Sequence, residues 1–226
     1  MILRSLYQSD IIMNHSRIAT YIIFIPCLLL AAIFLLSPVL SAADGPTPEH
    51  TIGRLNAALL DTMKGADELG YKGRYQLLEP VISDVFALSF MASKAMGSHW
   101  KKLTPKQREI YLKTYTDWTV ATYAGRFDGY SGESFDISRS APVDQDTVAV
   151  KSSILKPGGE RIVDFKYLLR RMSGEWRIID IRIVEVSQLA LTRAQFVSVM
   201  NKEGFDSLIS MLKEKTMAFA GKGKGK

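Results

Sequence analysis

Two tight turns divide the middle of the chain into three β-rich runs, and this constrains the fold more than any other feature. The turns are Pro-Gly-Gly at 157–159 and Ser-Gly-Glu at 173–175, both typical of hairpin connections. Runs joined by turns this short pair as antiparallel neighbours. With the short alternating segment 135–137, they predict an antiparallel meander of about four strands. The three long runs are residues 147–155, 161–170 and 176–186.

Helical patterns precede and follow these strands. The clearest helix start is Thr104-Pro105-Lys106-Gln107, a capping box with proline in the first turn. The sequence therefore predicts an α+β fold, in which N-terminal and C-terminal helices wrap a curved antiparallel sheet. The expected helices are one from residue 48 that Gly70 and Gly73 break, a stretch over 75–80, one that Asp84 caps and Gly97 ends, one from 105 to about Gly125, and two closing helices over 187–200 and 206–219.

The N-terminus carries an export signal. An apolar run over residues 18–40 follows Arg17 and precedes the small residues Ser41-Ala42-Ala43, which predicts a secretory signal peptide over residues 1–43, with Met13 a possible true start. A retained membrane anchor is the alternative, because the run reaches the ~20 residues that a span needs. We expect cleavage, and with it a periplasmic protein. The remainder reads as one domain over 44–220 and a flexible basic tail over 221–226.

Little in the sequence points to catalysis. The only cysteine, Cys27, lies inside the predicted signal peptide, and the motifs of phosphate loops, dinucleotide sites and zinc proteases are absent from the sequence. Asp164 and Asp180 fall inside predicted strands, where a carboxylate in a cavity can act as a general base. The favoured alternative is an outward side chain or an ion pair with Arg161, Lys166 or Arg182. We therefore expect no cofactor, no metal and no enzyme activity.

The chain is basic, with 29 Lys and Arg residues against 23 Asp and Glu residues. Lys101, Lys102, Lys106 and Arg108 lie near aromatic residues, a pattern also found in nucleic-acid-binding proteins. An exported protein rarely meets nucleic acid, so a solvated helix entrance is the simpler interpretation. Contact with an anionic membrane surface or with an acidic partner is the sharper one.

Bulky apolar residues recur on one face of the predicted sheet and on the helices expected to cover it. The two-residue period of a strand places alternate side chains on the same face. Such a surface either fills itself or leaves an apolar cavity for a hydrophobic ligand. The residues expected to line the cavity are Val163, Phe165, Tyr167 and Leu169 on one strand, Ile179, Ile181 and Ile183 on the next, and Phe86, Phe90, Tyr115 and Trp118 on the helices.

Four sequence blocks, in this order behind a signal peptide, carry a family resemblance. The blocks are residues 86–92 with Gly97 and Trp100, residues 103–108 with Tyr123, residues 176–187, and residues 193–209. On these residues the chain resembles the MlaC-type periplasmic phospholipid-shuttle family, also described as toluene-tolerance auxiliary proteins. It is most similar to the hopanoid-biosynthesis-associated branch called HpnM. The resemblance spans residues 47–215.

The resemblance implies a sheet like that of nuclear-transport-factor-like proteins, enclosing acyl chains, in a lipid carrier without catalytic activity. It implies a phospholipid or hopanoid cargo, and two protein partners: an outer-membrane lipoprotein complex, and the lipid-binding ring protein of an inner-membrane ABC transporter. One departure stands out. Related chains commonly have Gly before the Ser of the third block, whereas this chain has Val186 before Ser187. We therefore expect the turn after that strand to differ.

Overall fold

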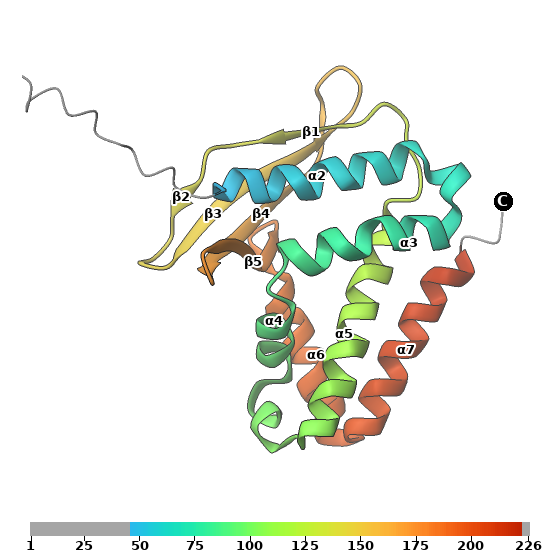
Figure 1. Ribbon diagram of the computed structural model, residues 1–226, viewed down its shortest axis with the longest axis vertical. Helices are drawn as coiled ribbons and strands as arrows, with labels where there is room; N and C mark the ends of the chain where they lie inside the picture. The colour runs from blue at the N-terminus through green and yellow to red at the C-terminus, as the bar shows by residue number, and fades with distance from the viewer. Residues whose placement is uncertain (1–45, 223–226) are drawn as a thin grey trace, which may run out of the picture. The chain divides into compact units, whose positions relative to one another are not determined.

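The computed structural model describes residues 46–222, so the predicted signal peptide and the last four residues of the predicted tail lie outside the described residues. Within this range the strands form one antiparallel sheet in the order β1-β3-β4-β5-β6, with β2 also paired to β3 (Figure 1). The predicted meander is confirmed. The strands are β1 (Ser134–Ile137), β2 (Ala141–Pro142), β3 (Thr147–Leu155), β4 (Arg161–Met172), β5 (Glu175–Ile183) and β6 (Val186–Ser187).

The two predicted hairpin turns are present, and a third turn was not predicted. The expected strand over 176–186 is broken, because β5 ends at Ile183 and the chain reverses into β6. Val184 and Glu185 form this reversal with φ of 50° and 58°. A two-residue hairpin turn needs positive φ at both central residues and usually contains Asn or Gly. The pair Val-Glu carries no such signal, so the sequence pattern missed the turn.

Helices lie before and after the sheet, as expected. Thr104 caps α5 with both hydrogen bonds of the capping box, of 3.0 and 3.2 Å, and Thr47 caps α2. The helices are α2 (Pro48–Lys64), α3 (Ala66–Val85), α4 (Leu88–Met96), the short 3-10 helix η1 (Gly97–Lys102), α5 (Pro105–Arg126), α6 (Gln188–Lys202) and α7 (Phe205–Lys222). No helix of residues 46–222 is both long and apolar enough to cross a membrane.

The boundary between α3 and α4 differs from the prediction. Asp84 does not cap α4, because it lies in the last turn of α3, where its carboxylate binds Arg54 at 2.6 Å. Phe86 follows in an extended conformation and forms an isolated parallel bridge with Ile178 of β5. The bridge to β5 keeps Phe86 in an extended conformation, so the helix cannot begin before it. α4 therefore starts at Leu88.

The helix that starts at residue 48 ends at Lys64, with Gly65 as its C-cap, and not at Gly70 and Gly73 as predicted. Gly70 instead interrupts α3, with φ 55° and ψ −176°, and Gly73 is helical.

Specific polar contacts fix the helices on one face of the sheet. α2 crosses this face, and the buried Asn56 donates a 2.9 Å hydrogen bond from Nδ2 to Ser152 of β3 (Figure 1). The buried Arg74 of α3 donates from Nε to the carbonyl of Ala124 near the end of α5, at 2.9 Å. Gly125 lets α5 approach α7 closely, because a Cβ at this position would clash with the ring of Phe219.

Candidate functional site

The face of the sheet that the helices cover holds most of the residues expected to meet lipid. Phe86, Tyr115, Tyr167 and Leu169 belong to one core cluster and are at most 3% exposed. Four others pack against the edge of this cluster and remain partly accessible: Phe90, Trp118, Phe165 and Ile181. Val163 and Ile183 are half-buried and lie near the end of the sheet, outside the cluster. The expected apolar surface is therefore largely present.

Aromatic rings from α5 and α6 form the centre of this surface. The ring centroids of Tyr115 and Trp118 lie 5.7 Å apart, and Phe196 of α6 lies 5.7 Å from Trp118 and 6.3 Å from Tyr115. Phe196 is fully buried but was not among the predicted lining residues. Its helical spacing from Leu189 and Met200, both of which pack on the same cluster, is the sequence signal that identifies it.

The hydroxyl groups of the core tyrosines stay uncharged over a wide pH range. Burial raises the pKa of Tyr111, Tyr115, Tyr123 and Tyr167 above the ordinary value of 10. The hydroxyl of Tyr111 donates a 3.0 Å hydrogen bond to the carbonyl oxygen of Ala92. The surface between sheet and helices is thus neutral as well as apolar, which suits hydrocarbon.

One predicted lining residue faces the other way. A β-bulge shifts the register so that Leu168 pairs with Asp180 while Leu169 pairs with Ile178. Strict alternation predicted that Ile179 and Ile181 share one face of the sheet. This prediction was wrong, because a bulge places two residues of one strand opposite one residue of its neighbour and so breaks the alternation. Ile178 takes the core position. Ile179 instead joins a small cluster on the opposite face of the sheet, with Ala87, Ala149 and Leu168.

The core side chains pack against one another. Tyr115 and Tyr167 are buried by protein neighbours, and the rings of Phe86 and Tyr123 pack at 5.6 Å. At these positions the space that a hydrocarbon chain would need is filled by side chains. A ligand bound here must displace these contacts, and the rim residues Trp118, Phe165 and Ile181 are the ones still partly accessible.

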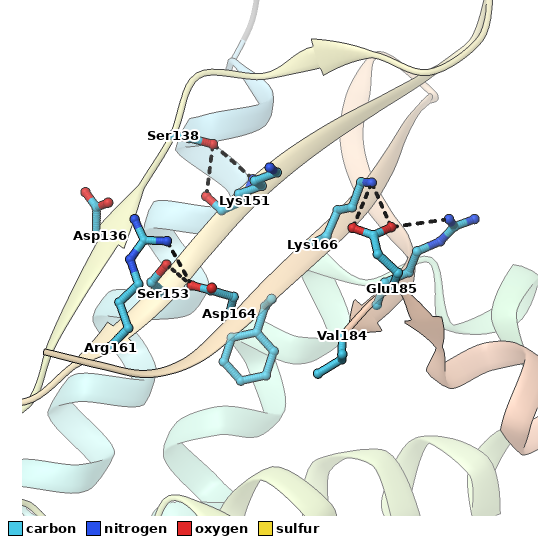
Figure 2. Close-up of a pocket in the computed structure, with 11 residues that line it drawn as sticks. Asp136, Ser138, Lys151, Ser153, Arg161, Asp164, Lys166, Val184 and Glu185 are labelled. Atoms are coloured by element: carbon cyan, nitrogen blue, oxygen red, sulfur yellow. Dashed lines mark hydrogen bonds and ion pairs between the residues drawn. The ribbon is translucent and has the colours of Figure 1, made fainter.

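A polar hollow of about 330 Å³ lies over strands β1, β3, β4 and β5 and the β5–β6 turn (Figure 2). Phe165 belongs both to its lining and to the rim of the core cluster. The hollow was not predicted, because its charged residues come from separate strands. It is lined by Asp136, Ser138, Lys151, Ser153, Arg161, Asp164, Phe165, Lys166, Arg182, Val184 and Glu185.

The two strand carboxylates have structural partners. Asp164 is 60% exposed, accepts a 2.5 Å hydrogen bond from Ser153 and pairs with Arg161 at 3.4 Å. Asp180 is buried, and its Oδ1 accepts hydrogen bonds from the backbone N–H groups of Ile181 and of Leu189 in the first turn of α6. Its Oδ2 lies 4.0 Å from Arg182 Nε. The ion pairs with Arg161 and Arg182 confirm the alternative interpretation of both residues.

Comparison with known proteins points to one family. The family model described as MlaC protein matches residues 54–214, which is more than half of the chain. Among curated proteins, the intermembrane phospholipid transport system binding protein MlaC of Haemophilus influenzae is 28% identical over 130 residues, or 56% of this chain. The match spans 61% of that relative's length.

A solved structure shows the same fold. It is the phospholipid-binding protein from Ralstonia solanacearum in complex with a phospholipid, with a TM-score of 0.66 and 23% sequence identity. The alignment covers 76% of this chain and 98% of that chain.

Proposed function

Since this chain belongs to the MlaC family, we propose that it is a periplasmic phospholipid-binding transport protein in which one domain over residues 44–220 binds the lipid. The observation that carries the proposal is the neutral aromatic and aliphatic surface between the sheet and the helices. It supplies apolar contacts for hydrocarbon from both layers, and its rim is still partly accessible. Removing hydrocarbon from water is favourable by ~25 cal/mol per Å² of apolar area.

The mechanism we propose is exchange of one apolar packing for another. Tyr115 and Phe196 pack against each other, and Tyr167 is buried in the same cluster. Acyl chains entering past Phe165 and Ile181 replace part of these contacts as the helices separate from the sheet. The hydrophobic gain of the lipid offsets the lost packing, so no covalent step or external energy is needed for binding itself.

The finer assignments are also proposals. We propose export by the N-terminal signal peptide, and exchange of cargo with an outer-membrane lipoprotein complex and with the lipid-binding ring protein of an inner-membrane ABC transporter. The resemblance to the hopanoid-associated HpnM branch supports a hopanoid as the alternative cargo. The curated relative, named as a phospholipid transport binding protein, supports a phospholipid.

A cavity enzyme that uses Asp164 or Asp180 as a base is less well supported. Asp164 lines the hollow on the outer face of the sheet, where it is 60% exposed and paired with Arg161. One oxygen of Asp180 already accepts two backbone hydrogen bonds. Neither carboxylate belongs to the apolar core cluster. We therefore propose that the protein binds and releases its cargo without changing it.

Extraction of bound lipid tests the carrier function. The protein is purified without detergent, extracted with organic solvent and analysed by mass spectrometry. We expect about one lipid per protein in the loaded fraction. A protein that arrives empty and also takes up neither added phospholipid nor added hopanoid would overturn the proposal.

Two variants place the lipid. Phe165→Asp and Ile181→Asp put a carboxylate at the rim of the core, and we expect both to lose bound lipid, since burying an uncompensated charge costs several kcal/mol. Ile162→Asp is the matched control on the same strand, because Ile162 is exposed. Circular dichroism and a cooperative melt must first show native folding. Wild-type lipid content in folded Phe165→Asp and Ile181→Asp would show that the lipid lies elsewhere.

A further inference from the structure

A row of three cations crosses the outer face of the sheet. Lys151 of β3 is directly opposite Lys166 of β4, and Lys166 is directly opposite Arg182 of β5. Opposed residues of antiparallel strands have Cβ atoms about 5 Å apart, and like charges in such positions destabilise a sheet. The repulsion between these cations therefore destabilises the sheet at this position.

The β5–β6 turn brings one carboxylate, that of Glu185, to this row of cations. Glu185 contacts Lys166 Nζ with both oxygens, at 3.0 and 3.2 Å, and lies 3.9 Å from Arg182 (Figure 2). Lys151 has no ion pair within residues 46–222. The hydrogen bond from Lys166 and the charges of Lys166, Arg182 and Lys151 hold the pKa of Glu185 below its ordinary value. Two carboxylates thus face three cations: Glu185 contacts Lys166 and Arg182, and Asp180 Oδ2 lies 4.0 Å from Arg182 Nε.

This carboxylate is held by a strained turn. Val184 and Glu185 both adopt positive φ, a backbone conformation that is unfavourable for any residue with a Cβ. β-branched residues such as valine rarely occupy this region. The Glu185 side chain is also 68% exposed, so its ion pairs are weakened by solvent and contribute little. Strain and exposure together make Glu185 an easily displaced occupant.

The cation row is continuous with the rim of the apolar core. β5 ends at Ile183 opposite Phe165, so residues 161–164 of β4 extend past the last β5 neighbour. At this end Phe165 contacts the core cluster and also lines the hollow. A lipid can therefore place its acyl chains past Phe165 while its head group lies in the hollow. Asp136 and Asp164 lie toward the β1 side, where Arg161 neutralises Asp164.

We propose that the hollow is a phosphate site for the head group of the carried lipid, in which the phosphate replaces Glu185 on Lys166 and Arg182. Charge-assisted hydrogen bonds from Lys and Arg are the strong donors for phosphate oxygens. The free protein keeps the site neutralised with its own carboxylate, and the ligand releases the turn. This inference rests on the proposed lipid-carrier function and selects a phosphate-bearing cargo over an uncharged hopanoid.

Binding of two lipids that differ only in the phosphate tests the site. The probes are phosphatidylglycerol and diacylglycerol carrying the same pyrene-labelled acyl chains, titrated into delipidated protein while fluorescence is followed. We expect Lys166→Gln and Arg182→Gln to weaken phosphatidylglycerol binding about ten-fold each. Glu185→Gln should strengthen it by up to about five-fold. None of the three should change diacylglycerol binding. The matched control is Lys213→Gln, which removes an equal charge from an exposed position on α7.

The outcomes separate the two proposals. Failure of the wild-type protein to bind either lipid would overturn the carrier function. Equal binding of both lipids, unchanged in the row variants, would overturn the phosphate site alone. Glycerol phosphate without acyl chains distinguishes the source of the phosphate. Its displacing the labelled lipid at equal concentration would show a site for free phosphate esters and overturn the assignment to a lipid head group.

Discussion

The two faces of the sheet are built from the same strands but are organised by different forces. On the covered face, Tyr167 and Leu169 of β4 are buried among aromatic residues of the helices. On the outer face, the neighbouring Lys166 belongs to a row of charges and is only partly covered. Packing dominates the first face, whereas the second combines a small apolar cluster around Leu168 and Ile179 with the row of charges. Substitutions in the main core should therefore change stability by several kcal/mol, and substitutions of the charged residues should mainly change what the protein binds.

The largest effect is expected from Leu169→Ala. Leu169 is fully buried in the main core cluster, so its loss should destabilise the protein by about 3 to 5 kcal/mol. Leu168→Ala is the matched control, because Leu168 is the adjacent residue but belongs to the small cluster on the outer face. It should cost about 2 kcal/mol or less. Urea unfolding measures both, and equal losses would show that the two faces are packed alike.

The next largest effect should be a loss of folding stability at high pH, caused by the buried tyrosines of the covered face. Burial raises the pKa of Tyr111, Tyr115, Tyr123 and Tyr167 above 10, whereas the unfolded chain ionises near 10. A raised pKa in the folded state stabilises the protein below pH 10, and this contribution falls as the pH rises above 10. Absorbance at 295 nm should show these tyrosines ionising together with the loss of circular dichroism. Ionisation of all tyrosines before any unfolding would contradict their burial.

Much of the fold that these two predictions probe follows from short sequence signals. The predictions of the capping box at Thr104 and of the turns at 157–159 and 173–175 are correct, because each depends only on residues a few positions apart in the sequence. The predicted start of α4 and the predicted face of Ile179 are wrong, because residues distant in the sequence determine both. Phe86 pairs with Ile178 of β5, and Asp180 beside the bulge accepts a hydrogen bond from α6.

Asp180 offers a smaller test that also addresses the enzyme alternative. Asp180→Asn removes a negative charge of β5 that accepts a hydrogen bond from the first turn of α6 and interacts favourably with the helix dipole, and it should cost about 1 kcal/mol. Asp164→Asn should change stability by less than about 0.5 kcal/mol, because that carboxylate is exposed. Thermal melts at neutral pH measure both. An equal or larger loss of stability for Asp164→Asn would show that Asp180 is not the carboxylate with the structural role.

A change of similar size but opposite sign, a gain in stability, is expected at the β5–β6 turn. Replacing Val184-Glu185 by Asn-Gly supplies the residues that tolerate positive φ, and should stabilise the protein by about 1 kcal/mol. Val186→Asn is the control, because it places the same side chain in β6, where strand geometry disfavours it. Differential scanning calorimetry compares the two. A lower melting temperature for the Asn-Gly variant would show that the turn is not strained.

The sequence by itself determined the α+β class, the meander, the helix caps and most residues of the apolar surface, because periodicity and turn chemistry act over a few residues. Eight of the eleven predicted positions, among them Tyr115 and Leu169, lie in the core cluster or against it. Only the tertiary structure decided the cation row and its counter-charge. Lys151, Lys166 and Arg182 lie far apart along the chain, and strand register alone sets them side by side. Register depends on the whole sheet, and Glu185 reaches the row only through a turn that no local signal announces.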